Sequence, residues 1–422
     1  MLFKFIHTAD IHLDSPLQGL QQYPGAPVEQ IRGATRQALQ ALVELALGED
    51  VIFILIAGDL YDGDWKDYNT GLFFAALMTK LREAGVKVFI VDGNHDAASN
   101  MTKHLRLPEN VKRLSSRNPE SIELGDLGVV VHGQSFHTKA VSDDLAAKFP
   151  LARPSLFNIG LLHTSATGRP GHEPYAPCTL EDLLSKGYDY WALGHVHQRE
   201  VLHQEPWVLF SGNIQGRHVR ETGPKGCTLV TVDDGKVVSV EHQDLDVLRW
   251  SICQVDASGA ENPQEALDLL LNRLEEEIDL SAGRPLALRL RLFGPCRAHA
   301  ELAMKGDQWI SEIRAMATDL SGGAIWIEKV LFETQTEANL EEMLARQDTL
   351  GSLLRGIRDL SLDDRLLKDL QAEFGDLNRK IPAELKMGGG LAGLENQETY
   401  RQTLDNVKQL LLGRLLNRGA GQ

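Results

Sequence analysis

The sequence predicts an α/β fold: a two-sheet α/β sandwich, followed by a small α+β domain and a helical C-terminal region. Over residues 1–245, short apolar runs alternate with amphipathic helical patterns. A compact module of strands and helices follows over residues 246–335, and charged helical patterns fill residues 336–422. Strands that alternate with helices at this spacing are typical of βαβ units, so the first region is expected to hold a sheet with helical connections.

The first region opens with strands and helices in alternation. Continuous apolar runs such as residues 51–57 predict strands that are buried on both faces. Apolar residues at helical spacing, as in Ile31, Ala34 and Ala38, predict a helix with one buried face. We expect strands at 2–8, 51–57 and 86–91, and helices at 28–47 and 66–84.

The remainder of the first region is richer in strands. We expect strands at 128–132, 157–163, 190–194, 208–210, 227–232 and 237–241. One helix interrupts them after Thr179, because Asp182 stands three residues further on, as in a capping box. A mixed sheet or a sandwich of two sheets fits this pattern.

The last two regions differ from the first. Strands at 250–255, 285–293 and 325–332 and helices at 263–277 and 307–320 predict a small α+β domain. From residue 339 the pattern is helical and charged, with breaks at Pro382 and glycines 388–390 and a last helix at 395–416. Because this tail has few aromatic residues for a core of its own, it is expected to dock on a partner or to pack loosely on the rest of the chain.

Composition limits the classes of function. The chain has 422 residues, 43 basic against 59 acidic, and a net charge of −16, which argues against a protein that coats nucleic acid by bulk charge. A nucleic-acid enzyme with a local basic groove is not excluded. Four dispersed cysteines without a Cys-x-x-Cys pair argue against disulfides and a Cys-based zinc site. No signal-peptide core or membrane span is evident at the start of the chain, so we expect a cytoplasmic, non-membrane protein.

Five short segments carry metal-ligating side chains, each where a predicted strand ends. Ligands of α/β sheets gather outside the carboxyl ends of the strands, so these segments are expected to lie together. Oxygen and imidazole donors without thiolates favour Mn, Fe, Zn or Ni. The segments are residues 10–12, 58–62, 93–96, 163 and 194–197.

These side chains divide between two divalent metal ions. The first ion would take Asp10, His12, Asp59 and His197, and the second would take Asp59, Asn94, His163 and His195. A bridging Asp59 requires ions about 3.5–4 Å apart, a pair that orients a phosphate and lowers the pKa of a bound water. His95 stands beside a ligand and is expected to protonate the leaving oxygen.

The order of these segments resembles the calcineurin-like metallophosphoesterase superfamily, over about residues 1–245. Two longer stretches, residues 12–17 and 212–226, resemble the YhaO family of SbcD-like DNA exonucleases. The second resemblance covers most of the chain and includes a capping domain that matches residues 246–335. It implies a metallophosphoesterase sandwich that hydrolyses DNA phosphodiesters, most often with Mn. It also implies that the residues named above are the metal ligands and catalytic groups.

The segment that contains Asp62 differs from the matching segment of protein phosphatases and from that of SbcD-like nucleases. Protein phosphatases carry an arginine shortly after it, where Gly63, Asp64 and Trp65 stand here, and the missing phosphate clamp disfavours that activity. SbcD-like nucleases often carry a histidine where Asp62 stands. Asp62 is therefore a candidate catalytic residue, with a surface or supporting carboxylate as the alternative.

Three basic stretches are candidate DNA contacts, although a charge run is more often a solvated face. The first is Arg217, His218, Arg220 and Lys225, with a loop held by an Arg220–Glu221 pair as the alternative. The second is Lys103, His104, Arg106, Lys112, Arg113 and Arg117. The third is residues 280–300, which hold four arginines and no acid, with Arg289 and Arg291 expected on an outward strand face.

We expect a two-metal DNA exonuclease of repair or processing that uses a metal-activated water and His95. A small-molecule or cyclic-nucleotide phosphodiesterase or phosphatase is the alternative, and a non-catalytic scaffold is the third hypothesis. The resemblance also implies an SbcC-like ATPase bound through the C-terminal helices, and a homodimer. Residues 1–250 and 251–422 each carry a net charge of −8, so we expect weak, site-focused DNA binding with a shallow salt dependence.

Overall fold

The computed structural model describes residues 1–15, 28–62, 68–98, 106–166, 175–336, 344–345, 347–361, 368–369 and 397–419. Several predictions fall outside these residues: Lys103 and His104 of the second basic stretch, residues 63–65, Pro382 and glycines 388–390. The chain forms two compact units. The first comprises Met1–Gln21, Gly25–Ser251 and Arg284–Ala287, and the second contains Ile252–Gly283 and Leu288–Gln422. The division into three domains at residues 245 and 335 stays a prediction.

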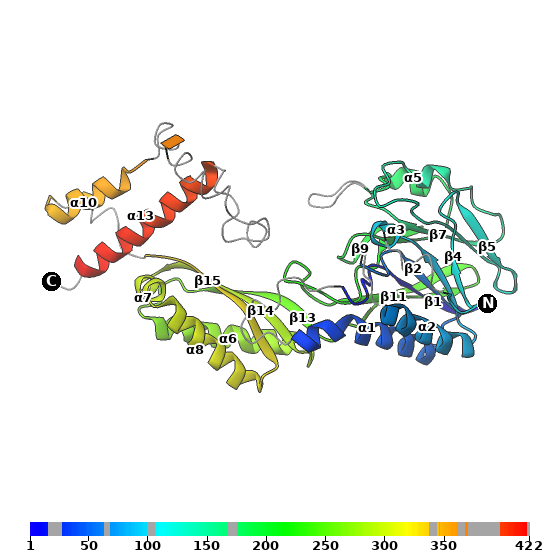
Figure 1. Ribbon diagram of the computed structural model, residues 1–422, viewed down its shortest axis with the longest axis horizontal. Coiled ribbons are helices and arrows are strands. Elements are labelled where there is room, and N and C mark those ends of the chain that lie inside the picture. Colours follow the sequence, from blue (N-terminus) through cyan, green and yellow to red (C-terminus); the bar gives the residue numbers. More distant parts are fainter. Residues whose placement is uncertain are drawn as a thin grey trace. The chain divides into compact units, whose positions relative to one another are not determined.

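Two six-stranded mixed sheets form the first unit (Figure 1). One has the order β12 (Lys236–Asp244), β11 (Gly226–Asp233), β1 (Phe3–Thr8), β2 (Phe53–Ala57), β3 (Lys87–Val91), β4 (Val111–Arg113). The other has the order β5 (Glu120–Leu124), β6 (Val129–Gln134), β7 (Phe157–His163), β8 (Tyr190–Gly194), β10 (Trp207–Phe210), β9 (Glu200–Gln204). The run from β1 to β4 and the run from β6 to β10 are parallel, so their carboxyl ends meet at one edge of each sheet.

Apolar side chains fill both faces of the central strands. In β2, Phe53 and Leu55 face the other sheet, whereas Ile54 and Ile56 face the helices α1 (Val28–Gly48) and α2 (Tyr68–Glu83). This two-sided burial explains why the predicted strands are continuous apolar runs. The outer face of the second sheet packs under α5 (Leu180–Leu184), which begins at the expected capping box of Thr179 and Asp182. The short helices of this unit are α3 (Asn94–Ala98), η2 (Gly125–Leu127) and η3 (Ala146–Lys148).

A three-stranded sheet and several helices form the second unit. Its strands are β13 (Arg249–Asp256), β14 (Leu286–Cys296) and β15 (Ile325–Thr336), in that order. Its helices are α6 (Pro263–Leu280), α7 (His299–Met304), α8 (Gly306–Ser321), α10 (Thr349–Arg358) and α13 (Gln397–Gly419). Leu354, Ile357 and Leu412 join α10 to α13 in a small apolar cluster. Within the described residues, no helix combines the length and apolarity that a bilayer crossing needs.

The predicted fold class is confirmed: two mixed sheets with covering helices form an α/β sandwich, followed by helical C-terminal elements. The sequence did not predict the strands β4, β5 and β9 or the short helices α3, η2, η3 and α7. The strand β4 has three residues, and β5 and β9 are half-exposed edge strands without a strong apolar alternation. These strands form because they pair with neighbouring strands, and the local sequence pattern does not reveal that pairing.

The arginines of the third basic stretch, residues 280–300, form ion pairs within the protein, and their contact with DNA stays a prediction. Arg289 binds Glu328 through two hydrogen bonds of 2.8 and 2.7 Å, across the neighbouring strands β14 and β15. The other three arginines also contact carboxylates: Arg284 with Asp246, Arg291 with Glu333 and Arg297 with Glu261. Acids distant in sequence therefore neutralise a stretch that contains none of its own.

The packing between the sheets predicts the cost of truncating Phe5. Its ring is fully buried and stacks on Phe53 at a centroid distance of 5.0 Å. Phe5→Ala should lower the free energy of unfolding of the first unit by about 3–5 kcal/mol, because it leaves a cavity between the sheets. Urea unfolding would measure this. Leu72→Ala, at a residue of α2 that is 61% exposed, is the matched control and should change the value by less than about 0.5 kcal/mol.

Candidate metal centre

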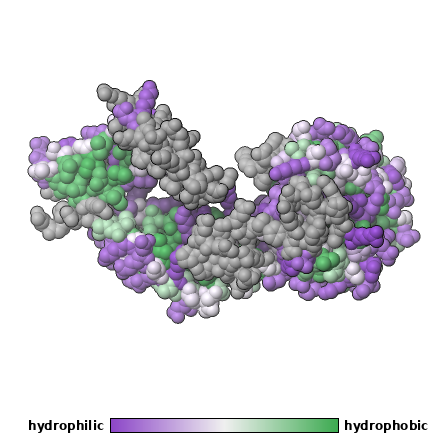
Figure 2. Space-filling model, in the orientation of Figure 1, coloured by the Kyte–Doolittle hydropathy of each residue, from purple (hydrophilic) through white to green (hydrophobic). Residues whose placement is uncertain are grey.

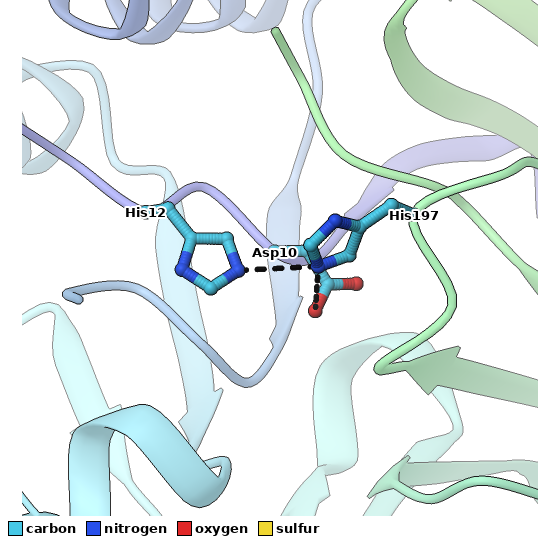
Figure 3. Close-up of side chains that lie close together, drawn as sticks. All are labelled: Asp10, His12 and His197. Carbon is cyan, nitrogen blue, oxygen red and sulfur yellow. Dashed lines mark hydrogen bonds and ion pairs between the residues drawn. The ribbon is translucent and has the colours of Figure 1, made fainter. Parts of the chain in front are cut away.

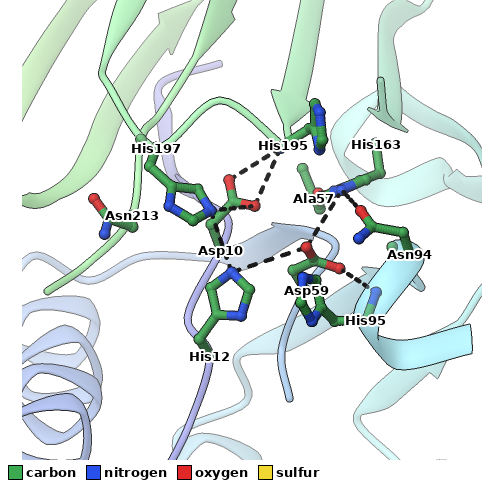
Figure 4. Close-up of polar contacts among 12 residues, drawn as sticks. Asp10, His12, Ala57, Asp59, Asn94, His95, His163, His195, His197 and Asn213 are labelled. Carbon is green, nitrogen blue, oxygen red and sulfur yellow. Dashed lines mark hydrogen bonds and ion pairs between the residues drawn. The ribbon is translucent and has the colours of Figure 1, made fainter. Parts of the chain in front are cut away.

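All five predicted segments lie at carboxyl ends of strands, and backbone hydrogen bonds hold them together. The chain after β1 runs beside the chain after β2, since Asp10 N donates to Gly58 O at 3.0 Å and His12 N donates to Asp59 O at 3.0 Å. The second sheet joins them where His195 N donates to both carboxylate oxygens of Asp10, at 3.0 and 3.2 Å. Figure 4 shows the resulting cluster of histidine, aspartate and asparagine side chains.

The first group of potential ligands comprises Asp10, His12 and His197, whose ligand atoms all lie within 4.8 Å of one another (Figure 3). His197 Nε2 lies 3.2 Å from His12 Nε2 and 3.8 Å from Asp10 Oδ1. Asp10 and His12 are each 1% exposed. Three donors thus converge on one point from two segments that are 185 residues apart.

The second group comprises Asp10, Asp59 and His163, again within 4.8 Å. His163 Nδ1 donates to Ala57 O at 2.9 Å, which leaves Nε2 to face Asp59 Oδ2 at 3.5 Å and Asn94 Oδ1 at 3.1 Å. The donors of both groups suit a divalent cation, because Asp10 and Asp59 are buried carboxylates whose neighbours are imidazoles and backbone N–H groups. A buried anion needs a compensating charge or a proton.

His195, predicted for the second ion, lies beside this group. Its ring is edge-on to that of His163 at 5.2 Å and to that of Tyr175 at 5.6 Å. The three groups of closely spaced ligand atoms found in the described chain do not include His195. Its role as a ligand stays a prediction.

Burial determines the protonation of the cluster. Burial first, and then the charge of Asp96, raise the pKa of Asp59 to about 7. Burial and the charge of Asp59 likewise raise the pKa of Asp10. Burial lowers the pKa of His12 and of His163, so both imidazoles are neutral and able to donate a lone pair.

The backbone is strained where the ligands stand. Within the described residues, ten non-glycine residues have positive φ, and Asp10, His12, Asp59 and His195 are four of them. Such angles cost about 1–3 kcal/mol each and cluster at functional sites. Here they turn side chains of adjacent strand ends toward one point, which regular pleating would not allow.

Two glycines are required by close approach. Gly58 has a φ of 90°, and a Cβ there would stand 2.4 Å from His163 Nδ1. A Cβ at Gly93 would stand 2.3 Å from Asp59 Oδ1. Both glycines therefore let a neighbouring ligand come near the strand end.

Asp96 is a supporting residue for which the sequence analysis gave no role. It is 1% exposed, and its carboxylate accepts hydrogen bonds from Leu60 N and Gly93 N at 3.1 Å and from Tyr61 N at 2.9 Å. These bonds join the segment after β2 to the segment after β3. Its position two residues after Asn94, in the first turn of α3, is the signal that the sequence offered.

Asp62 contacts His95 directly. Its Oδ1 lies 2.7 Å from His95 Nδ1, and its Oδ2 accepts a hydrogen bond from Ser15 Oγ. Burial opposes ionisation of Asp62, but the bonds from histidines and Ser15 outweigh it and hold its pKa below the usual range. Burial also opposes the charged form of His95, but the Asp62 hydrogen bond and the charge of Asp59 raise the pKa of His95. The pair favours an ionised carboxylate beside a protonated imidazole.

The predicted DNA contacts divide into two inward and two outward side chains. Lys225 is 3% exposed, and its Nζ donates to His197 O at 2.9 Å, so it supports the histidine segment, and its contact with DNA stays a prediction. The guanidinium of Arg217 also faces inward, 3.5 Å from Asp62 and 3.3 Å from Glu221. His218 and Arg220 are exposed. Glu221 binds Arg217, whereas the alternative reading of this loop paired it with Arg220.

The second basic stretch is partly neutralised in the same way. Lys112 forms an ion pair of 2.6 Å with Glu120, and Arg113 contacts Asp92 at 3.2 Å. Arg106 and Arg117 are exposed. A DNA-binding role for this stretch stays a prediction.

This fold and this cluster match known families. The calcineurin-like phosphoesterase family matches residues 3–199, and the family of the metallophosphoesterase YhaO middle domain matches residues 250–335. The uncharacterized metallophosphoesterase YhaO of Bacillus subtilis is 34% identical over 413 residues, which cover 96% of this chain and 93% of that protein. The chain therefore belongs to the YhaO family of calcineurin-like metallophosphoesterases.

More distant relatives include proteins that are named for DNA repair. The DNA double-strand break repair protein Mre11 of Sulfurisphaera tokodaii is 25% identical over 291 residues, which cover 65% of this chain and 67% of that protein. Among solved structures, a dimetal phosphatase from Danio rerio is 12% identical and covers 57% of this chain and 99% of that one, with a TM-score of 0.33.

The close approach of Gly93 to Asp59 gives a test of the site geometry that does not depend on activity. Gly93→Ala should lower the free energy of unfolding of the first unit by about 1–3 kcal/mol, because the added methyl group overpacks the turn. Gly125→Ala is the control, since a Cβ there meets nothing within 4 Å. Equal stability of the two variants in urea unfolding would contradict the geometry described for Asp59.

Proposed function

We propose that the protein is a metal-dependent DNA phosphodiesterase that acts as an exonuclease in DNA repair or processing. The observation that carries the proposal is the buried pair Asp10 and Asp59 with imidazoles gathered around both carboxylates. Family membership supports hydrolysis of a phosphate ester, and the Mre11 relatives support DNA as the substrate. The fold class by itself would not decide the substrate.

Two divalent ions, with Mn as the proposed metal, would be held by two sets of side chains that share Asp59, whereas the two groups of closely spaced ligand atoms share Asp10. Asp10, His12, Asp59 and His197 would hold the first, and Asp59, Asn94, His163 and His195 would hold the second. When bound, the ions would neutralise negative charge on the phosphate and favour loss of a proton from the attacking water. The protein's contribution is to fix these side chains at strained strand ends before the substrate arrives.

His95 is the proposed proton donor. Because Asp62 occupies Nδ1, Nε2 is the ring nitrogen available to a substrate, and the side chain is 36% exposed. In the reaction, the water oxygen bonds to phosphorus while the bond from phosphorus to the sugar oxygen breaks. His95 gives its proton to that sugar oxygen, and the proton lost from water passes to solvent. Asp62 orients the imidazole and stabilises its charged form.

His218 and Arg220 are the proposed DNA contacts of the loop that follows the last metal segment. Both side chains are exposed, and His218 Nε2 also lies 3.5 Å from Glu221 Oε1, whereas Arg217 and Lys225 are more deeply engaged with the protein. An exposed basic pair at the rim of a metal centre suits the phosphates that flank a scissile bond.

The C-terminal helices are the proposed docking site for an SbcC-like ATPase with a coiled coil. Leu353 and Leu360 near α10 and Val407 and Leu410 of α13 are 38–50% exposed, and Figure 2 shows an apolar area over these helices. The two helices are basic, with six Lys and Arg against two acids. An acidic partner surface would therefore fit. A homodimer and a cytoplasmic location stay predictions.

A substrate panel tests the proposed activity. The full chain with Mn²⁺ should degrade linear DNA in preference to RNA, cyclic nucleotides and a chromogenic diester. Asp59→Asn should abolish hydrolysis, and His95→Ala should lower kcat by about 10²–10⁴-fold, the usual contribution of a general acid. Glu109→Ala, at an exposed site, is the control. Intact DNA with and without an ATPase partner, together with cleavage of a cyclic nucleotide, would favour a small-molecule phosphodiesterase instead.

The salt dependence of DNA binding tests the proposed contacts. The affinity of the inactive Asp59→Asn protein for DNA should fall only slightly as the salt concentration rises, because the protein neutralises few phosphates. Arg220→Ala should lower the slope of log Kd against log salt by about one. Lys139→Ala, at another exposed lysine, should leave the slope unchanged. A steep slope that Arg220→Ala does not alter would contradict this assignment.

A further inference from the structure

We propose that Glu221 is a positioning residue for the metal ligand His197. The loop 212–221 holds the Glu221 carboxylate, which in turn fixes the orientation of the His197 ring. The inference rests on the proposed metal centre and adds a residue that is not a ligand itself. Glu221 is 5% exposed, and its Oε1 lies 2.6 Å from His197 Nδ1. It stands 24 residues after that histidine.

This contact fixes which nitrogen of His197 can bind a metal. An ionised carboxylate only accepts hydrogen bonds, so Nδ1 must carry the proton. Nε2 then carries the lone pair, and it faces His12 Nε2 at 3.2 Å and Asp10 Oδ1 at 3.8 Å. Carboxylates that hold the second nitrogen of a ligating histidine orient the ring and raise its basicity.

Glu221 is itself held rigidly by the loop. Its Oε2 accepts hydrogen bonds from Asn213 Nδ2 at 3.0 Å and from Arg217 N at 2.8 Å. Arg217 Nη2 adds a contact of 3.3 Å to Oε1. Asn213 is buried and gives its second amide proton to Gln215 O at 2.9 Å. Each carboxylate oxygen therefore has a fixed place before a metal binds.

Arg217 extends this support to the other side of the centre. Its Nη1 lies 3.2 Å from Ser15 Oγ and 3.5 Å from Asp62 Oδ2. One guanidinium thus lies between Glu221, which holds His197, and Asp62, which holds His95. A purely structural alternative is that Glu221 serves to neutralise Arg217, and the experiment must separate the two.

The experiment is a calorimetric titration of the metal-stripped full chain with Mn²⁺. We expect two sites in the wild type. Glu221→Ala should weaken one site by about 10–100-fold and leave the other, as for other residues that support a ligating histidine. Glu221→Gln keeps an acceptor for Nδ1 but loses the charge, and should weaken the same site by a smaller factor. Glu109→Ala is the control, and circular dichroism checks that each variant is folded.

A double-mutant cycle separates positioning from general structure. If Glu221 acts through His197, Glu221→Ala should change Mn²⁺ binding little further in a His197→Ala background. Additive losses in the cycle, or a wild-type titration curve for either Glu221 variant, would overturn the inference. If the Glu221→Ala variant does not fold, the Mn²⁺ titration of the Glu221→Gln variant tests the inference. A wild-type chain that binds no Mn²⁺ would instead overturn the proposed metal centre, so the two failures are distinguishable.

Discussion

Two carboxylates, Asp10 and Asp59, stand side by side in the interior of the first unit, at the ends of adjacent parallel strands. Both contact imidazoles and backbone N–H groups, and among the described residues no ion pair within 4 Å joins either of them to a lysine or arginine. Two buried anions at this distance are unfavourable unless protons or cations compensate them. Asp10 and Asp59 lie together despite this cost, because the surrounding hydrogen bonds and packing prevent the two carboxylates from moving apart.

That constraint explains the backbone around the centre. Positive φ at four site residues and glycines at the points of closest approach keep the ligands together where ordinary strand ends would let them diverge. Asp96 ties two of the segments to each other through three backbone amides. The sandwich supplies the rigidity, since large aromatic side chains such as Phe5 and Phe53 fill the space between the sheets. The destabilised site therefore depends on a well-packed core.

The sequence predicted the strands of the sandwich well because they are buried on both faces and read as apolar runs. It placed the metal segments at strand ends because ligand residues follow those runs directly. It could not predict the edge strand β9, whose residues are half-exposed and whose position depends on pairing with β10. Nor could it predict the direction of a side chain in a loop. Lys225 and Arg220 are both basic residues of one stretch, yet the first supports His197 from inside and the second faces solvent. Glu221 was missed for the same reason, since only the folded loop brings it to His197.

Many basic side chains form ion pairs or hydrogen bonds within the protein, which affects how this acidic chain would bind DNA. Arg289, Arg291 and Lys112 are paired with acids, and Lys225 is bound to a backbone carbonyl, so much of the positive charge that the sequence displays is not available to phosphates. With a net charge of −16, long-range attraction to DNA has to come from elsewhere. Two divalent ions would add about four positive charges at the point where the scissile phosphate binds. A basic pair of C-terminal helices would attract an acidic partner, and a DNA-binding partner would then provide the affinity that this chain lacks. Under the proposed function, the protein would supply the chemistry, and the metal ions and the partner would supply most of the binding energy for DNA.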